Sequence, residues 1–354
     1  MTVLLGGGHI ASVVHRERPV NPLWDPPWPT IEPGARRLGS TETYGTEAEG
    51  QLLSSISGHN LCLDVFGEHS PGERESGLTF HGEAGMVAWE VTEVVDSSPD
   101  CRLTLRAELP RTALTVERTF HCREGASQIL VESRVTNRVG FERALGCAEH
   151  VTLGAAFLSP SPTLFASNAD RGITWPGPDS VTDDAFADFQ EFEYPHVPLR
   201  GGDKIDWRQY PRSDVNSDCC TLRIRPEDPW GWFVAAHNPS QIALAYVWER
   251  QAFPWLMTWE ENHFRGDPPW NSRTLTRGLE FTSYAFALGR RKNVEMGTLL
   301  ETPTYAWLDA NETRSTRFVV SLHPYDAPLE LAPELTPAGD STLRAEPHRW
   351  TVDV

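Results

Sequence analysis

Residues 103–122, LTLRAELPRTALTVERTFHC, alternate apolar and polar side chains on both sides of a short break at Pro110. Before the break an apolar residue recurs at every second position, and after it Leu114, Val116 and Phe120 fall on one face. A period of two is typical of a strand with one buried face. Two such runs around a short break therefore predict an antiparallel β-hairpin.

The same alternation recurs along much of the chain, in residues 129–138, 231–238, 241–250, 279–288 and 316–322. Helical periodicity is scarce, and the best window for a helix is residues 180–194. Clusters of Gly, Pro, Asn or Asp separate many of the runs. We therefore predict an all-β fold, a large antiparallel β-sandwich with few short helices, rather than βαβ units.

Residues 159–230 are rich in Pro, Gly, Asp and Ser. A stretch of this kind inside a compact domain is more often a set of functional or covering loops than a linker. We therefore predict a single β-sandwich domain over residues 1–354, with a loop-rich excursion at about 159–230.

The chain has 354 residues, with 31 Lys and Arg against 49 Asp and Glu, so its formal net charge is −18. An acidic surface repels phosphate backbones and anionic lipid, which excludes nucleic acid and membranes as expected partners. No run approaches the ~18 apolar residues that a membrane-spanning helix needs. The short apolar run in residues 1–14 has no basic region before it, so we expect no signal peptide and a cytoplasmic location.

The chain has six cysteines, and none of them forms a C-x-x-C pair. In a chain of this size they are expected to be small buried thiols in a reducing compartment. His263 lies among acidic residues but lacks a second histidine at metal-ligand spacing, so no metal is predicted. No cofactor is predicted either.

Three polar residues stand in apolar strand contexts and are candidates for proton transfer. His81 follows an apolar run at a turn, His150 lies in the apolar run CAEHVTLG (147–154), and Glu280 lies between Leu279 and Phe281. Burial moves the pKa of a carboxyl or imidazole group, which can fit it for acid–base work.

The order of these motifs resembles the aldose 1-epimerase (galactose mutarotase) family. The resemblance rests on LTFHGEAGMVAWEV (78–91), GCAEHVTLG (146–154), RGLEFTSYAF (277–286) and the closing segment LDANETRSTRFVVSL (308–322). It covers nearly the whole chain through short motifs. The chain departs from the family in having no arginine in ISGHNLCLDVFG (56–67), before the first histidine, and no clear match to the family's substrate-binding aspartate.

The resemblance implies a mutarotase-like supersandwich and an isomerase that needs no cofactor. It implies that Glu280 acts as base, that His150 acts as acid, and that His81 orients a sugar oxygen. Glu301, in LLET, is a competing candidate for the base. We favour Glu280 because 32 residues (312 − 280) separate it from Glu312, which leaves room for another strand before the closing turn.

Residues 248–270 interleave tryptophans with carboxylates and amides. Sugars present hydroxyl edges and apolar faces, so their sites combine aromatic platforms with polar acceptors. The predicted substrate is a neutral hexose. The residues predicted to bind it, besides His81, are Trp259, Glu261, Asn262 and Trp270.

Two other functions stay open at this point. The same fold can serve as a non-catalytic carbohydrate-binding protein. Alternatively, a pair of carboxylates such as Glu261 and Glu280 could process a glycoside. The oligomeric state is not determined by the sequence.

Overall fold

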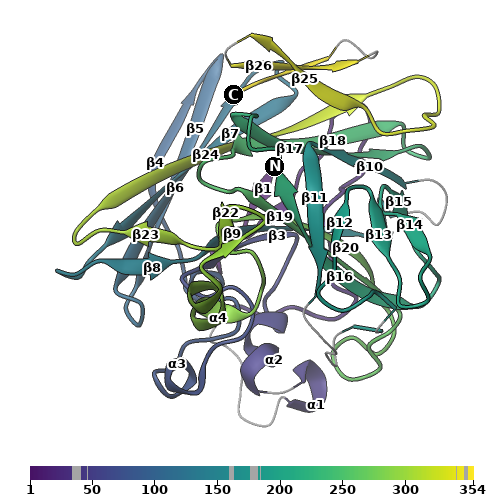
Figure 1. Cartoon of the computed structure of the whole chain (residues 1–354). Helices are drawn as coiled ribbons and strands as arrows, with labels where there is room; N and C mark the ends of the chain where they lie inside the picture. Colours follow the sequence, from purple (N-terminus) through teal and green to yellow (C-terminus); the bar gives the residue numbers. More distant parts are fainter. Residues whose placement is uncertain are drawn as a thin grey trace.

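The structure is a computed structural model of the chain. It describes residues 1–33, 41–45, 47–158, 163–175, 182–183, 185–339, 341–346 and 350–354. Within these residues two nine-stranded antiparallel sheets dominate the fold and enclose a common core (Figure 1). The predicted all-β antiparallel sandwich with few short helices is confirmed.

The first sheet has the strand order β1 (Thr2–Val3), β2 (Ile10–Ser12), β3 (His59–Leu63), β9 (Cys147–Gly154), β20 (Leu275–Thr282), β19 (Trp255–Asn262), β16 (Asn216–Ile224), β11 (Ala169–Thr174) and β12 (Glu191–Glu193). The second sheet has the order β15 (Gln209–Tyr210), β10 (Thr163–Ser167), β17 (Trp230–His237), β18 (Ile242–Glu249), β24 (Thr313–Pro324), β7 (Gln128–Asn137), β6 (Leu114–Arg123), β5 (Asp100–Leu109) and β4 (Glu90–Ser97).

Apolar side chains from both sheets form the main core between them. Leu279 and Phe281 of β20 point into this core, where Phe281 stacks on Trp248 of β18 with ring centroids 4.5 Å apart. Successive strand residues point to opposite faces. Glu280 and Gly278 therefore lie on the other face of the first sheet, away from the second sheet.

The predicted hairpin is present as β5 and β6, which pair along their whole length from Leu109 with Leu114 to Asp100 with Arg123. The alternating runs at 129–138, 231–238, 241–250 and 316–322 fall in β7, β17, β18 and β24. The run 279–288 is a strand only up to Thr282, because β20 ends there.

The stretch 159–230 differs from its prediction as a loop-rich excursion. Its described residues include β10 of the second sheet, β11 and β16 of the first sheet, and a two-stranded sheet of β13 (His196–Pro198) and β14 (Lys204–Asp206). The helix predicted at 180–194 is wrong for the part described there, where β12 forms at its end. Residues 180, 181 and 184 of that window lie outside the described residues.

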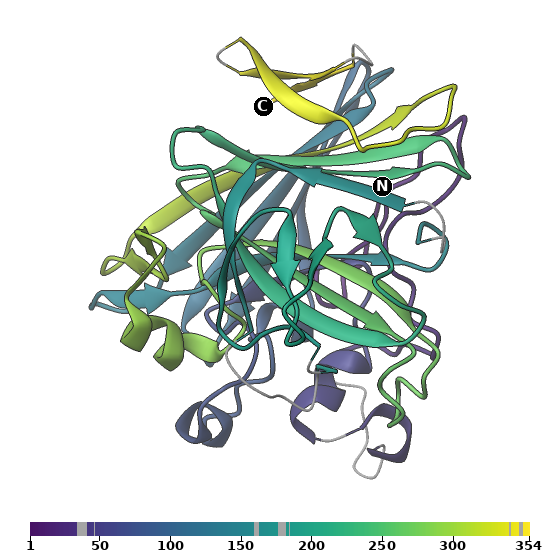
Figure 2. The same ribbon diagram turned by 45° about the vertical axis from the view of Figure 1, so that its right-hand side comes forward.

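A third layer lies above the second sheet (Figure 2). It consists of β25 (Glu334–Gly339), β26 (Thr342–Glu346) and β27 (Thr351–Asp353). Leu335, Leu343 and Val352 of this sheet pack against the outer face of the second sheet, around Val234 and Val319.

The helices among the described residues are few and short. They are α1 (Thr41–Tyr44), α2 (Glu47–Leu53), α3 (Pro71–Glu75), α4 (Gly289–Met296) and the 3₁₀ turn η1 (Ala84–Met86). Of these, α1, α2 and α3 lie near the bottom of Figure 1 and α4 lies above them. Small two-stranded sheets of β8 (Arg143–Leu145) with β23 (Ala306–Leu308) and of β21 (Thr298–Leu299) with β22 (Thr302–Pro303) complete the fold. Among the described residues, no helix combines the length and apolar character needed to cross a membrane.

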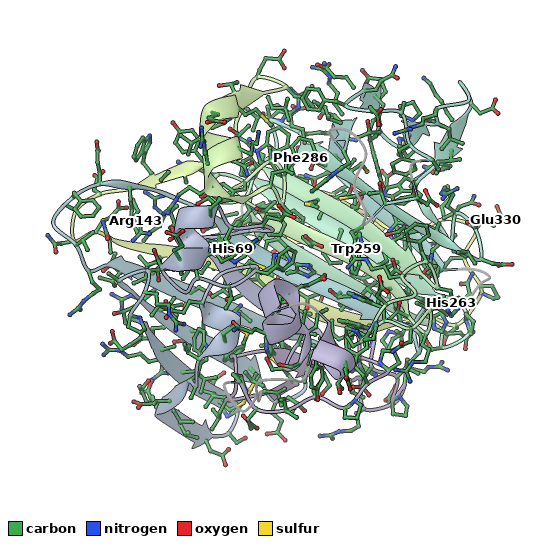
Figure 3. All side chains as sticks on the ribbon, turned by 90° about the horizontal axis from the view of Figure 1, so that it is seen from below. His69, Arg143, Trp259, His263, Phe286 and Glu330 are labelled. Atoms are coloured by element: carbon green, nitrogen blue, oxygen red, sulfur yellow. A yellow bond between two sulfur atoms is a disulfide. The ribbon has the colours of Figure 1, made fainter. Side chains whose placement is uncertain are left out.

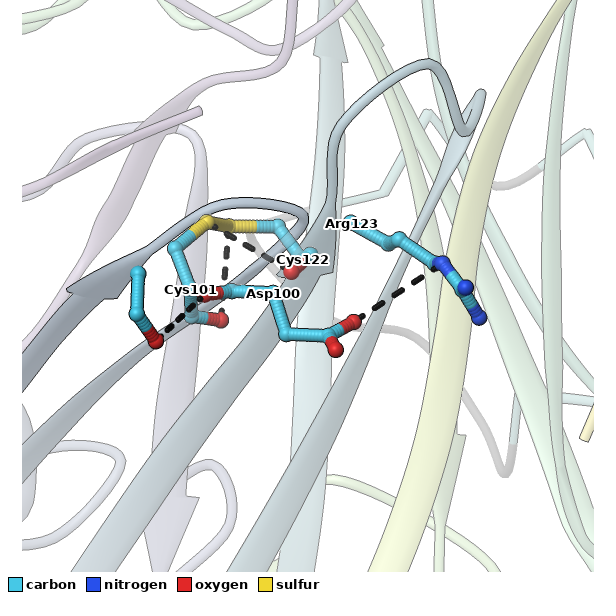
Figure 4. The surroundings of a disulfide bond; sticks show 5 residues. Asp100, Cys101, Cys122 and Arg123 are labelled. Carbon is cyan, nitrogen blue, oxygen red and sulfur yellow. Dashed lines mark hydrogen bonds and ion pairs between the residues drawn. A yellow bond between two sulfur atoms is a disulfide. The ribbon is translucent and has the colours of Figure 1, made fainter.

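Cys101 and Cys122 form a disulfide that links directly opposed residues of β5 and β6 (Figure 4). The expectation of six free thiols is therefore wrong for this pair. The other four cysteines, Cys62, Cys147, Cys219 and Cys220, are buried and free. Because disulfides are uncommon in reducing compartments, the cysteines no longer support a cytoplasmic location.

Candidate active site

His150 and Glu280 face each other across the centre of the first sheet. They are directly paired residues of β9 and β20, and His150 Nε2 lies 3.2 Å from Glu280 Oε1. The other ring nitrogen, Nδ1, lies 3.1 Å from Thr152 Oγ1, two residues along the same face of β9. The strand register alone thus brings an imidazole and a carboxyl group into contact.

Burial shifts both members of this pair toward their neutral forms. The Glu280 side chain is 2% exposed and the His150 side chain 8%. Burial lowers the pKa of His150 to about 3 and raises the pKa of Glu280 well above its ordinary value. Over a broad pH range the pair therefore holds one proton, and moving it from Glu280 to His150 converts the neutral pair into an ion pair.

His81 lies beside this pair on a tight turn. Its own φ is 62° and that of Gly82 is 85°, and the Gly67 N–H donates a hydrogen bond of 3.1 Å to His81 Nδ1. The rings of His81 and His150 are nearly perpendicular, with centroids 5.0 Å apart. Burial is the main cause that lowers the pKa of His81 well below its usual value, and repulsion from His150 in its protonated form adds to it. The neutral ring therefore carries its proton on Nε2.

Gly278 keeps space open next to the pair. It is paired with Thr152 of β9 on one side and with Trp259 of β19 on the other. A Cβ atom at this position would lie 2.5 Å from Glu280 Oε1 and 3.4 Å from Trp259 Cε3. The missing side chain therefore lets the carboxyl group and the indole ring occupy neighbouring positions.

The His150–Glu280 pair and His81 line a cavity of about 320 Å³. This is the small end of the usual range for ligand pockets, roughly 300–1,000 Å³. His81, His150, Thr152 and Glu280 line it together with Leu52 and Leu53 of α2 and with Glu49, Glu68, His69 and Arg74. Figure 3 shows Trp259 on this face of the sheet and His69 toward the side of α3.

Tryptophans form much of the cavity wall. Trp24, Trp175, Trp259 and Trp270 all line it. Trp270 stacks on Trp24 with ring centroids 5.9 Å apart and an angle of 10° between the planes. It meets Trp259 edge to face, with centroids 6.0 Å apart. Flat aromatic surfaces of this kind suit the apolar face of a sugar ring.

The residues predicted from the sequence are not all brought together. His81, His150, Glu280, Trp259 and Trp270 line one cavity. Glu261 lies on the same face of β19 as Trp259, but its Oε1 accepts the backbone N–H groups of Phe264 and Arg265, at 3.0 and 2.9 Å, and it does not line the cavity.

Asn262 and Glu301 lie elsewhere. Asn262 points to the opposite face of β19, where its Nδ2 donates to Asn216 Oδ1 at 2.9 Å and its Oδ1 accepts from the Tyr210 hydroxyl. Glu301, the competing candidate for the base, is 78% exposed and forms ion pairs with Arg171 and Arg223. Neither residue lines the cavity, so neither is kept in the site proposed below.

Several cavity residues were not singled out in the sequence. Trp24 lies in the proline-rich segment VNPLWDPP (20–27). Arg265 and Glu49 show no signal in the sequence, because their contact joins a loop and a short helix that are 216 residues apart. The tryptophan between prolines was a usable signal, because a large aromatic residue in a rigid loop often covers a pocket or a core.

His263 does not join a metal-binding cluster. Its Nδ1 lies 2.8 Å from the Ser272 carbonyl oxygen. Within the described ranges, no group of three or more His, Cys, Asp or Glu side chains is arranged to hold a metal ion.

The fold is shared with solved structures of mutarotase-like proteins. No protein-family profile matches the chain, and no curated protein matches it by sequence. Comparison of the structures, however, finds the same fold in a "putative aldose 1-epimerase", a "galactose mutarotase-like protein" and a "galactose mutarotase related enzyme".

One similar structure is a "putative aldose 1-epimerase" from Klebsiella pneumoniae, with a TM-score of 0.64 and 15% identity over 90% of this chain and 74% of that one. A galactose mutarotase-like protein from Clostridium acetobutylicum has a TM-score of 0.57 and 9% identity over 91% and 92% of the two chains. A galactose mutarotase related enzyme from Lactobacillus acidophilus has a TM-score of 0.54 and 12% identity over 93% and 96%. At these identities the likeness establishes the fold.

Proposed function

We propose that the protein is an aldose 1-epimerase-like isomerase, which interconverts the anomers of a neutral hexose by acid–base ring opening. The observation that carries this proposal is the contact of 3.2 Å between His150 Nε2 and Glu280 Oε1 at the wall of a tryptophan-lined cavity. The mutarotase-like fold supports the same reaction class. We propose Glu280 and His150 as catalytic residues, and His81, Trp259 and Trp270 as residues that bind the sugar.

The protein contributes proton transfers to this reaction, and the only other bond that changes is C1–O5 of the sugar. In the ion-pair form, the Glu280 carboxylate takes the proton of the C1 hydroxyl while protonated His150 gives a proton to the ring oxygen. The C1–O5 bond breaks, and the sugar becomes an open aldehyde. Rotation about C1–C2 followed by reclosure gives the other anomer, as Glu280 returns its proton to the C1 oxygen and His150 regains one from the O5 hydroxyl. The protein ends with the proton count it had at the start.

The environment of the pair fits this exchange. Burial favours the neutral pair, and the attraction between opposite charges favours the ion pair. The two forms differ only in whether Glu280 or His150 carries the proton, so they interconvert without proton exchange with bulk water. His81, with its proton on Nε2, donates a hydrogen bond to a sugar oxygen. Trp259 and Trp270 hold the apolar face of the ring.

Polarimetry on freshly dissolved α-glucose and α-galactose tests the proposal. The wild-type protein should accelerate the approach to anomeric equilibrium, and Glu280→Gln and His150→Asn should each reduce kcat by roughly 10²–10⁴-fold. Circular dichroism checks that both variants fold. If the wild-type protein accelerates none of the common aldoses above the buffer rate, the enzyme proposal fails.

The alternatives have separate signatures. Calorimetric sugar binding without any mutarotation, unchanged in Glu280→Gln, would favour a carbohydrate-binding protein. A glycoside-processing enzyme would release reducing ends from a glycoside. The position of Glu261 argues against the latter, because its carboxylate binds backbone N–H groups outside the cavity.

A further inference from the structure

Arg265 places a guanidinium group in the wall of the cavity. Its side chain is 14% exposed, and its Cζ lies 4.7 Å from the ring centroid of Trp270 and 5.8 Å from that of Trp259. A guanidinium at this distance from an indole ring is attracted to the ring face. The contact fixes Arg265 next to the two tryptophans that we propose as the sugar platform.

Carboxylates on two sides hold the guanidinium in place. Nη1 donates a hydrogen bond of 3.0 Å to Glu49 Oε1 of α2. Nε lies 3.6 Å from Glu261 Oε2, and Glu261 Oε1 accepts the backbone N–H of Arg265 itself. The long, flexible side chain therefore loses little further freedom when a ligand binds, which favours binding.

The guanidinium nevertheless keeps unused donors. An arginine carries five N–H donors in a flat fork. Among the described residues only Glu49 accepts a side-chain hydrogen bond from Arg265, while the buried Nε faces Glu261 Oε2 in an ion pair of 3.6 Å. The donors left for a ligand oxygen are therefore the Nη hydrogens that Glu49 does not engage.

We propose that Arg265 is a specificity-determining residue that donates hydrogen bonds to hydroxyl groups of the hexose, with Glu49 as the neighbouring acceptor. The inference rests on the proposed function, because it takes the cavity to be a sugar site. The flat fork matches two adjacent hydroxyl oxygens, and the Glu49 carboxylate can accept a hydroxyl proton beside it. Arg265 and Glu49 thus supply the donor and the acceptor that the tryptophan wall lacks.

A purely structural role predicts a different behaviour. Arg265 also ties the loop after β19 to α2 through Glu49. If it acted only as this tie, its loss would weaken every ligand by the same factor. Direct recognition instead couples Arg265 to one or two particular hydroxyl groups.

Sugars that each lack one hydroxyl group distinguish the two roles. We would measure KM and kcat by polarimetry for glucose, galactose and their 2-, 3-, 4- and 6-deoxy forms with wild-type protein, Arg265→Met and Arg265→Lys. We expect Arg265→Met to raise KM for the parent sugar by roughly 10- to 100-fold, the usual effect of losing hydrogen bonds from a charged group. We expect kcat to stay within about threefold, since Arg265 is not in the reacting pair.

The decisive result lies in the deoxy series. For at least one deoxy sugar, the KM values of wild-type protein and Arg265→Met should converge, because the partner hydroxyl is already absent. Arg265→Lys should recover only part of the affinity, because an ammonium group cannot bind two oxygens as a flat fork. The control is Arg291→Met, which removes an exposed arginine paired with Glu295 on α4 and should leave KM unchanged.

An unchanged KM in Arg265→Met, or an equal rise for every sugar in the series, would overturn the inference. The same sugars and variants are also titrated by calorimetry, so that Kd is obtained without turnover. If the wild-type protein binds sugars but does not interconvert anomers, the proposed reaction fails while the coupling of Arg265 to one hydroxyl can still be read from Kd. If no sugar binds, both proposals fail.

Discussion

Glu149 and His150 are consecutive residues of β9, and their side chains lie on opposite faces of the first sheet. Glu149 Oε2 lies 2.7 Å from His59 Nε2 and 2.9 Å from Arg118 Nη2, between the two sheets. His150 faces the cavity and contacts Glu280. One strand therefore separates a buried ionic cluster from the proposed catalytic pair, and the two can be perturbed independently.

Glu149→Gln should destabilise the protein while sparing the chemistry. The substitution leaves Arg118 without its carboxylate partner in the core, and breaking a buried ion pair typically costs about 3–5 kcal/mol. We expect the free energy of unfolding, measured with urea, to fall by about this amount, while kcat per folded molecule stays within a few-fold. Glu132→Gln, at an exposed pair with His121, is the control and should change the stability by less than about 1 kcal/mol. A loss of kcat as large as that expected for His150→Asn would contradict the separation of the two faces.

Gly278→Ala should impair catalysis through crowding. The added methyl group would lie 2.5 Å from Glu280 Oε1, so the carboxyl group must move. Displacements of about 1 Å at a reacting group can cost on the order of 10² in rate. We expect kcat to fall at least tenfold, with a small change in stability. Gly140→Ala, where nothing lies within 4 Å of the added atom, should retain full activity. Unchanged kinetics in Gly278→Ala would show that the observed position of Glu280 does not matter for turnover.

The acid limb of the pH–rate profile should lie well below the ordinary pKa of histidine. At low pH the pair leaves its one-proton state only when His150 is protonated while Glu280 also keeps its proton. Burial lowers the pKa of His150 to about 3, so this happens only in strong acid. Raising the pH removes the one-proton state only when Glu280 loses its proton, and burial raises the pKa of that carboxyl group. We therefore expect kcat/KM to be flat from neutral pH down to about pH 5, after subtraction of the buffer-catalysed rate. A decline centred near pH 6.5 in protein that circular dichroism shows to be folded would contradict this state of the pair.

The disulfide should contribute to stability but not to the reaction. Cys101 and Cys122 are 21 residues apart, and closing a loop of this size stabilises a fold by about 3 kcal/mol in the chain-entropy view. Neither cysteine lines the cavity. We expect Cys101→Ala/Cys122→Ala to lower the free energy of unfolding by about this amount and to leave kcat and KM unchanged. Thiol titration of denatured protein should give four thiols before reduction and six after it. Six thiols before reduction would contradict the disulfide.

The sequence was informative where one face of a strand is buried. Alternation identified β5 and β6 because their outer side chains, such as Arg102 and Glu108, are exposed. It failed for β16, in which all nine residues are buried. There Asn216, Asp218 and Arg223 form polar contacts inside the protein. The strand therefore lacks the alternation of apolar and polar residues that marks β5 and β6. The neighbouring β12–β15 are only two or three residues long, too short for a periodic signal.

The candidate site was predictable in part for the same reason. His150 and Glu280 stood out as polar residues in apolar strands, and the register then placed them side by side. The face on which a residue lies could not be inferred for β19, so Asn262 was grouped with Trp259 although their side chains point in opposite directions. Arg265 and Glu49 come into contact only because a loop packs on a short helix, and no local sequence pattern predicts a contact of this kind.

The hydrogen bond from the Gly67 N–H to His81 Nδ1 limits what that ring can do. With one nitrogen engaged by the backbone, His81 cannot accept a proton there without breaking this link. Its free edge can only offer a proton, so the oxygen it meets must present a lone pair. His81 therefore binds only an oxygen that points a lone pair at Nε2, and this requirement favours one orientation of the sugar in the cavity over others.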